Sequence, residues 1–190
     1  MNRMSKIYLL WALLLLVLPT RAQQDSRWGI STNGLLWLTG SPNIGGEFAA
    51  STHSSIAGGV SYNPFTFGTD HKMKHLLGQL EYRYWLSQSY SGHFFGAHVQ
   101  GGMFNIGGLP LSDDLRDHRY EGKVYGGGFT YGYHWNITKR FNIGAEIGLG
   151  YLRLNYTKYE CTVCGREVDR YRTNYLGPTK LAVSLVYLIQ

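Results

Sequence analysis

The sequence predicts an all-β fold, an eight-stranded antiparallel up-and-down transmembrane β-barrel, and three observations support it. The 190 residues include 25 Gly and 15 Tyr, while only 16% of the residues are charged. Side chains alternate between apolar and small or polar along several long segments, which is the period of a β-strand. Finally, the polar connections between these segments are mostly short at one end of the predicted strands and long at the other.

The first 22 residues have the pattern of a cleavable signal peptide. Arg3 and Lys6 precede an apolar stretch, Ile7–Leu18, and a small residue, Ala22, stands at the expected cleavage point. The stretch is shorter than the roughly 20 apolar residues of a spanning helix. Residues 1–22 are therefore expected to be a signal peptide and residues 23–190 a single β-barrel domain.

The charge of the expected mature chain is mild. Its leader contains Arg3, Lys6 and Arg21 and no acidic residue, so 18 basic residues fall to 15 against 12 acidic ones, a net charge of +3. Nucleic-acid-binding proteins carry a clustered basic face, so we expect no nucleic-acid partner.

The alternation is clearest in Tyr125–Trp135, where aromatic residues occupy every second position with one exception and glycines lie between them. The segments around Phe141–Tyr151, Leu181–Ile189 and Leu76–Leu86 repeat the pattern. Eight strands follow from it: Trp28–Leu38, Ile44–Ser51, Ser55–Asn63, His75–Leu86, Gly92–Phe104, Tyr120–Trp135, Phe141–Tyr156 and Gly177–Ile189. Several reach the roughly 9–11 residues that cross a bilayer at a tilt.

Connection lengths indicate which side of a membrane the loops would face. Asn63–Lys74, Asn105–Arg119 and Thr157–Leu176 are long and polar, whereas Ser87–Ser91 and Asn136–Arg140 are short. Short turns on the periplasmic side and long loops outside are typical of outer-membrane barrels. The cell outer membrane is thus the expected location, with outer-membrane lipid as the surroundings. A soluble, periplasmic, lipocalin-like binding barrel is the alternative.

The strand positions opposite the aromatic ones hold the charged residues. An eight-stranded barrel is filled by its own side chains, so charges inside it must pair. The predicted lumen network consists of five residues, Glu47, Glu81, Arg83, Glu146 and Lys180, and His98 and Gln100 fall on the same faces. A competing role for Glu81 and Glu146 is general acid and base. Because a filled lumen gives a substrate no access, we predict no enzyme, no cofactor and no small-molecule substrate.

Cys161 and Cys164 lie in the longest predicted loop. In an exported protein this spacing favours a local disulfide; metal or redox chemistry and free thiols are the alternatives. His71 and His75 are four residues apart, and Asp113, Asp114 and Asp117 are clustered, but charged residues in solvated loops are common, so we predict no metal site.

A series of motifs resembles a known family. It includes Ser61–Phe67 (SYNPFTF), Glu81–Trp85 (EYRYW), Tyr131–Trp135 (YGYHW), Tyr159–Gly165 (YECTVCG) and Asn174–Lys180 (NYLGPTK). The ordered set is similar to the Bacteroidota domain-of-unknown-function family 3575 over nearly the whole mature chain. This resemblance implies an exported barrel, in some genomes encoded near fimbrial assembly genes, and it supplies no catalytic residues.

Two functions are compatible with these features. The first is a structural or surface-interaction protein whose outer loops contact a partner, with a link to fimbrial biogenesis or adhesion. The predicted contact residues, chosen because Tyr and Arg are favoured at interfaces, are Tyr159, Arg166, Arg170, Tyr171, Arg172 and Tyr175. The second is a small outer-membrane enzyme that modifies lipid.

Overall fold

The computed structural model describes residues 26–67, 71–108, 116–161 and 165–189 of the chain. The predicted signal peptide, residues 1–22, lies outside the described residues, as does Cys164 of the predicted disulfide. The described residues form a strand-rich region from Ser26 to Ile189.

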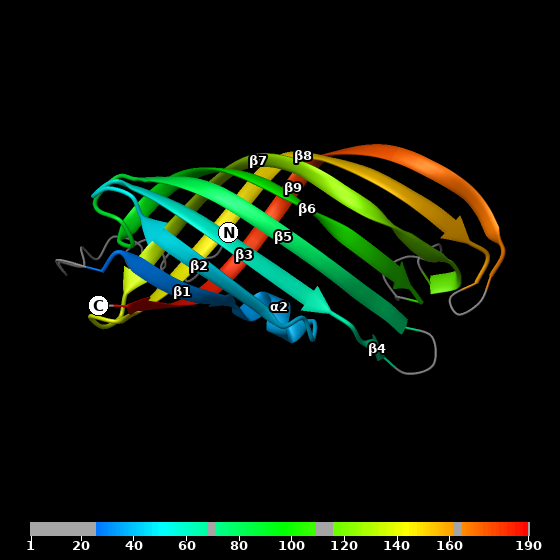
Figure 1. Ribbon diagram of the computed structural model, residues 1–190, viewed down its shortest axis with the longest axis horizontal. Coiled ribbons are helices and arrows are strands. Elements are labelled where there is room, and N and C mark those ends of the chain that lie inside the picture. The colour runs from blue at the N-terminus through cyan, green and yellow to red at the C-terminus, as the bar shows by residue number, and fades with distance from the viewer. Residues whose placement is uncertain (1–25, 68–70, 109–115, 162–164, 190) are drawn as a thin grey trace, which may run out of the picture.

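The described chain is almost entirely β-structure, with one five-residue helix and two further helical residues, Arg116 and Asp117 (Figure 1). The all-β prediction is therefore confirmed. The elements are β1 (Trp28–Asn33), α2 (Gly34–Leu38), β2 (Asn43–Ala49), β3 (Ser54–Asn63), β4 (Thr66–Phe67), β5 (His71–Trp85), β6 (Gly92–Gly107), β7 (Arg119–Asn136), β8 (Phe141–Tyr159) and β9 (Glu167–Ile189). Among the described residues, no helix is long and apolar enough to cross a membrane.

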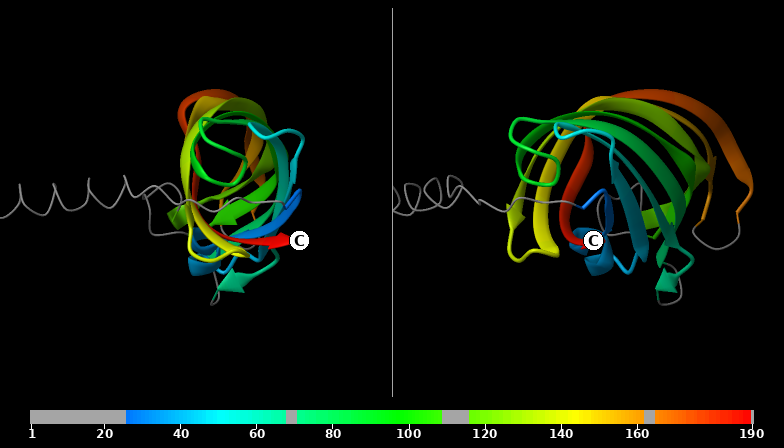
Figure 2. Two further views of the ribbon diagram at one scale, coloured as in Figure 1. Left: turned by 90° about the vertical axis from the view of Figure 1, so that its left-hand side faces the viewer. Right: turned by 60° about the vertical axis from the view of Figure 1, so that its left-hand side comes forward.

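Eight long strands form one antiparallel sheet in the order β3-β2-β1-β9-β8-β7-β6-β5, as the sequence predicted, and the two-residue β4 adds to β5. β3 also pairs with β5, from Ser54 opposite Tyr84 to Asn63 opposite His75. Each long strand thus has a neighbour on both sides for at least part of its length. The views of Figure 2 show the sheet curling round, which gives it an inward and an outward face.

The two ends of the curled sheet differ. At one end, the turn end, the short connections 50–53, 86–91 and 137–140 join neighbouring strands, and Trp28 pairs with Ile189. At the opposite end, the extended end, β5 to β9 continue beyond the ends of β1, β2 and β3, as the ladder from Lys72 opposite Gly107 shows (Figure 1).

The first predicted strand is too long, because β1 ends at Asn33 and α2 follows it. The Asn33 side chain explains the change. Its Oδ1 accepts hydrogen bonds from the Leu35 and Val183 backbone N–H groups at 3.1 and 3.2 Å, and its Nδ2 donates to the Leu181 carbonyl at 3.2 Å. The side chain thereby occupies backbone groups of β9 that a longer β1 would have used, and it caps the helix.

The predicted loop Thr157–Leu176 is also wrong, because β8 runs to Tyr159 and β9 starts at Glu167. Only residues 160–166 connect them. Every residue from Glu167 to Leu176 is exposed. Where both faces of a strand meet water, apolar and polar residues have no reason to alternate, so the period that reveals a half-buried strand is missing.

The inward face is polar along its middle and apolar at the turn end. Trp85, Tyr90, Phe94 and Leu188 are completely buried there, and Val186 packs against Tyr90 and Leu188. The outward face is the reverse of a water-soluble surface: its exposed side chains are mostly aliphatic or aromatic, with Phe129 78% and Tyr82 51% exposed. The core is therefore small, and the apolar surface is on the outside.

Candidate functional site

The five charged residues predicted for the interior meet in one cluster. Glu47 comes from β2, Glu81 and Arg83 from β5, Glu146 from β8 and Lys180 from β9. Glu81 and Arg83 are two positions apart, so both side chains point to the inward face. The cluster spans the space between strands on opposite sides of the sheet, because Arg83 reaches both Glu47 and Glu146.

Arg83 is the centre of this ion cluster. Its Nε lies 2.8 Å from Glu81 Oε2, its Nη1 lies 2.8 Å from Glu47 Oε2, and its Nη2 lies 2.9 Å from Glu146 Oε1. Lys180 Nζ adds contacts of 2.7 Å to Glu81 and 2.5 Å to Glu146. Three carboxylates and two cations leave a formal charge of −1. A buried cluster stays ionised only when its members pair as closely as this.

Hydroxyl, indole and imidazole side chains complete the cluster on the turn-end side. Ser55 donates a hydrogen bond to Glu47, and Trp85 Nε1 donates to Ser55 Oγ at 2.8 Å. His134 Nε2 lies 3.8 Å from Glu146 Oε1, and its ring meets Trp85 edge-on. Neither Ser55 nor His134 was predicted from the sequence. Their strand parity was available as a signal, but hydroxyl and imidazole side chains on a glycine-rich face do not stand out.

Inward-facing glycines make room for these rings. A Cβ on Gly132 of β7 would lie 2.4 Å from Phe94 Cζ, and one on Gly144 of β8 would lie 2.5 Å from His134 Nε2. Both distances are far below van der Waals contact, so only glycine fits. The glycine-rich strands are thus matched to the bulky side chains opposite them.

The turn 86–91 closes the turn end. Tyr90, with φ of +68°, is completely buried, and its hydroxyl donates to the carbonyls of Glu47 at 2.9 Å and Arg27 at 3.1 Å. Asn142 Nδ2 in turn donates to the Tyr90 carbonyl at 2.7 Å. Burial, and then the Glu47 carboxylate, raises the pKa of the Tyr90 phenol, so it remains a donor. The turn folds inward and fills the turn end of the interior.

The interior is hollow on the other side of the ion cluster. A cavity of about 270 Å³ is bordered by the cluster and by residues of β1, β2, β3, β5, β9 and α2, including Asn33, Asn43 and Gln79. His98 and Gln100, which the sequence also placed inside, hydrogen-bond with the hydroxyl and the carbonyl of Thr179 at 3.0 and 3.1 Å. Polar groups therefore line the interior from the ion cluster toward the extended end.

Glu81 and Glu146, the two carboxylates considered as general acid and base, are both ion-paired. Glu81 accepts from Arg83 and Lys180 through its Oε2, and Glu146 contacts Arg83, Lys180 and His134. A general base needs a lone pair that can accept a proton from substrate, and a pair of cations on the same carboxylate opposes protonation. The geometry is that of a structural network.

The predicted contact residues lie together at the extended end. Tyr159 ends β8, Arg166 is in the connection, and Arg170, Tyr171, Arg172 and Tyr175 are on β9. The register pairs Tyr171 with Tyr156, and Tyr120, Tyr156 and Tyr171 form a row across β7, β8 and β9 with ring centroids 5.6 and 5.5 Å apart. This row lies on the inward face.

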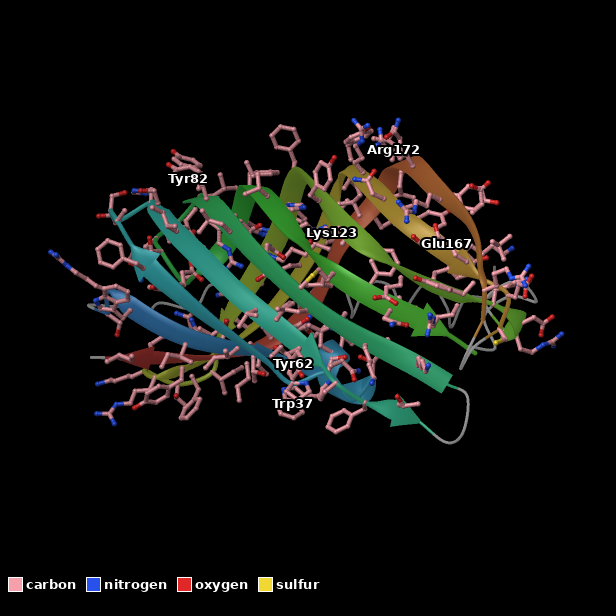
Figure 3. The ribbon with its side chains drawn as sticks, turned by 45° about the vertical axis from the view of Figure 1, so that its right-hand side comes forward. Trp37, Tyr62, Tyr82, Lys123, Glu167 and Arg172 are labelled. Carbon is pink, nitrogen blue, oxygen red and sulfur yellow. The ribbon has the colours of Figure 1, made fainter. Side chains whose placement is uncertain are left out.

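Arginines occupy the other face of the same strand. Arg170 and Arg172 alternate with Tyr171 and so point outward, and Figure 3 shows Arg172 on the same convex side as Tyr82. Arg170 Nε lies 2.6 Å from Glu167 Oε1, and this hydrogen-bonded carboxylate raises the pKa of Arg170. The end of β9 thus has an aromatic face and a basic face.

Of the predicted disulfide, Cys161 is half-buried and lies in the connection between β8 and β9. Its predicted partner, Cys164, is outside the described residues, so the pairing remains a prediction.

The chain belongs to the family described as protein of unknown function (DUF3575), whose model matches residues 8–189. The resemblance of its motifs to this family is therefore confirmed. Neither a curated protein nor a solved structure matches the chain.

Proposed function

We propose that this protein is an eight-stranded transmembrane β-barrel of the bacterial outer membrane that acts as a structural or surface-interaction protein through its extended end. The main support for the proposal is the reversal of polarity between the two faces of the sheet. Ions and hydrogen-bonded polar groups are buried inside, while apolar side chains are exposed outside. A hydrocarbon environment favours that arrangement and water opposes it.

The apolar outward surface continues around the sheet, because all eight long strands contribute to it. One exposed representative from each, in chain order, is Ile30, Ile44, Ile56, Leu80, Val99, Phe129, Leu149 and Leu181. Soluble monomers rarely expose contiguous apolar patches larger than a few hundred Å². A lipid bilayer is the partner that covers such a belt on all sides at once.

The short helix continues this belt where β1 stops. Trp37 and Leu38 of α2 are exposed, and so are Tyr62 of β3 and Phe65 beyond it; Figure 3 shows Trp37 and Tyr62 on the same side of the molecule. Tyr and Trp favour the boundary between hydrocarbon and water. These residues support a membrane boundary near the ends of β1 and β3.

A basic collar follows the apolar belt on the outward face of the extended end. Lys74 of β5, Lys123 of β7, Arg153 of β8 and Arg172 of β9 are exposed, and the strand register places them on the face of Leu76 and Tyr125. Cationic side chains at this depth fit the phosphate groups of membrane lipids. The extended end would then project from the membrane.

The difference between the filled turn end and the exposed extended end supports a surface-interaction role. The turn end is plugged by Tyr90 and the ion cluster, so transport through the interior is disfavoured. The exposed tyrosines and arginines of β9 are of the type enriched in protein interfaces. A partner in fimbrial assembly or adhesion would be contacted there.

Fractionation and gel mobility test the membrane assignment. The full-length protein is expected in the outer-membrane fraction, and a folded barrel should migrate differently on a gel before and after boiling. Recovery in the soluble periplasm, with one mobility under both conditions, would refute the barrel proposal.

A trimmed variant tests the role of the extended end. Leu154 and Thr173 are register partners, so an Asn-Gly turn joining them replaces residues 155–172 with a tight hairpin. We expect normal insertion and heat-dependent mobility, with loss of surface fibres or adhesion in cells that carry only this variant. Unchanged fibres and adhesion would argue against the surface-interaction role.

A further inference from the structure

The strand β9 has a free edge at the extended end. It pairs with β8 from Glu167 to Tyr187, whereas its ladder with β1 covers only Ser184–Ile189. Within the described part of the chain, no strand pairs with the other edge of Glu167–Leu176. Backbone N–H and C=O groups along that edge are a template for a further strand.

The edge has a defined limit on its barrel side. Pro178 has no N–H to donate, and its carbonyl accepts from Tyr175 Oη at 3.4 Å. The next carbonyl, of Thr179, accepts a hydrogen bond from Gln100. The Asn33 side chain hydrogen-bonds to the Leu181 carbonyl and to the Val183 N–H. The edge that remains free therefore ends at Leu176, and all of its residues are exposed.

The side chains along this edge specify the chemistry of a strand that could pair with it. Arg172 and Arg170, which is ion-paired with Glu167, point outward, and Tyr171 and Tyr175 point inward beside the tyrosine row. Asp169 is the other charged residue of the edge. Cross-strand neighbours on one face interact directly. An added strand with acidic residues on its outward face and apolar residues on its inward face would complement both sets.

The charges also oppose the simplest alternative occupant. A second copy of this chain, paired antiparallel through the same edge, would place Arg172 opposite Arg170 at a register centred on Tyr171. Like charges directly opposite each other destabilise a strand pair. The two outward arginines therefore disfavour this self-pairing register and favour a partner strand with acidic residues at those positions.

We propose that the free edge of β9, Glu167–Leu176, binds an extended segment of a partner protein in which acidic and apolar residues alternate. The segment adds a strand to the sheet, with main-chain hydrogen bonds giving affinity and the Arg and Tyr side chains giving specificity. This inference deepens the proposed surface-interaction role and rests on it for the statement that the edge faces the outside of the cell.

A designed peptide tests the proposal on the full-length protein in detergent micelles. The probe is a capped peptide of alternating Glu and Val, about ten residues long to match the edge, and the comparison peptide alternates Lys and Val. We expect the Glu-Val peptide to bind and to slow amide hydrogen exchange within Glu167–Leu176, while the Lys-Val peptide does neither.

Charge reversal provides the matched variants. Replacing both edge arginines (Arg170→Glu with Arg172→Glu) should weaken Glu-Val binding at least about tenfold and create binding of the Lys-Val peptide. The control reverses Lys123 and Arg153 (Lys123→Glu with Arg153→Glu), which share the outward face but lie on β7 and β8, two strands and one strand in from the free edge. It should change Glu-Val binding less than about twofold.

Three outcomes would overturn the proposal. Peptide binding without slower exchange in β9 would mean side-chain attraction without strand addition. Equal loss of binding in both charge-reversed variants would mean a general basic surface, of the kind that binds lipid phosphate. A wild-type dimer that the edge variant dissociates would mean that a second copy occupies the edge. Fractionation of the protein is independent of all three results, so a failure of the barrel proposal would be recognised separately.

Discussion

The ion cluster and the extended end of β9 are both built on β-strands, but their charged side chains differ in burial and in pairing. Inside the sheet, Arg83 contacts three carboxylates and every charge has a counter-charge within 3 Å. On β9, Arg172 is exposed on a strand with a free edge. Pairing geometry, not charge content, therefore separates a structural charge from one that is available to a partner.

The largest effect is expected from Arg83→Met, which removes the centre of the cluster. Glu47 loses its cation, and Glu81 and Glu146 keep only Lys180, so we expect a loss of about 3–5 kcal/mol in the free energy of unfolding. Urea titration followed by gel mobility of the unboiled protein measures it. Arg153→Met on the exposed face of β8 is the control, with a change within about 0.5 kcal/mol. Equal losses in the two variants would remove the distinction between paired and exposed charges.

A charge placed on the outward belt tests where the membrane ends. Val99→Arg lies in the middle of the belt, and we expect a loss of about 2–4 kcal/mol. Thr157→Arg lies on the same face of the extended end, beyond the basic collar and between its register partners Glu121 and Arg170, and should cost at most about 1 kcal/mol. Unfolding in lipid vesicles compares the two. Equal tolerance at both positions would contradict a bilayer around the belt.

A smaller effect on stability is expected in the turn 86–91, which fills the turn end of the interior. Tyr90→Phe keeps the ring and removes the hydroxyl that donates to the Glu47 carbonyl, for a loss of about 1 kcal/mol. Thermal unfolding monitored by tryptophan fluorescence is suitable because the ring centroid of Trp85 lies 6.2 Å from that of Tyr90. A variant as stable as the wild type would mean that packing alone holds the turn inside.

The smallest effect is expected in the tyrosine row. Tyr171→Ala removes the stacking on Tyr156, and we expect a loss of only about 0.5 kcal/mol because the site is exposed. Its effect on binding of the Glu-Val peptide should be larger than its effect on stability. A loss of several kcal/mol would show that the extended end is part of the core.

Much of the fold could be predicted because two environments impose a period of two. Between Tyr125 and Trp135, one face is apolar and the other is glycine or polar. Both the strand and the direction in which its side chains point could therefore be predicted. The same parity assigned Glu81 and Arg83 to the interior. It failed for Glu167–Leu176, where both faces are exposed, and for Gly34–Leu38, where a local helix replaces a strand.

The sequence by itself determined the strand-rich fold, the inward parity of Glu47, Glu81, Arg83, Glu146 and Lys180, and the family. Those properties depend on alternation and on motif order, which are local. Only the tertiary structure decided which carboxylates share Arg83, that Tyr90 turns inward, and that Asn33 ends the β1–β9 ladder and leaves the outer part of β9 with a free edge. Each of these depends on residues far apart in the chain, whose meeting is set by the register of strands and not by sequence spacing.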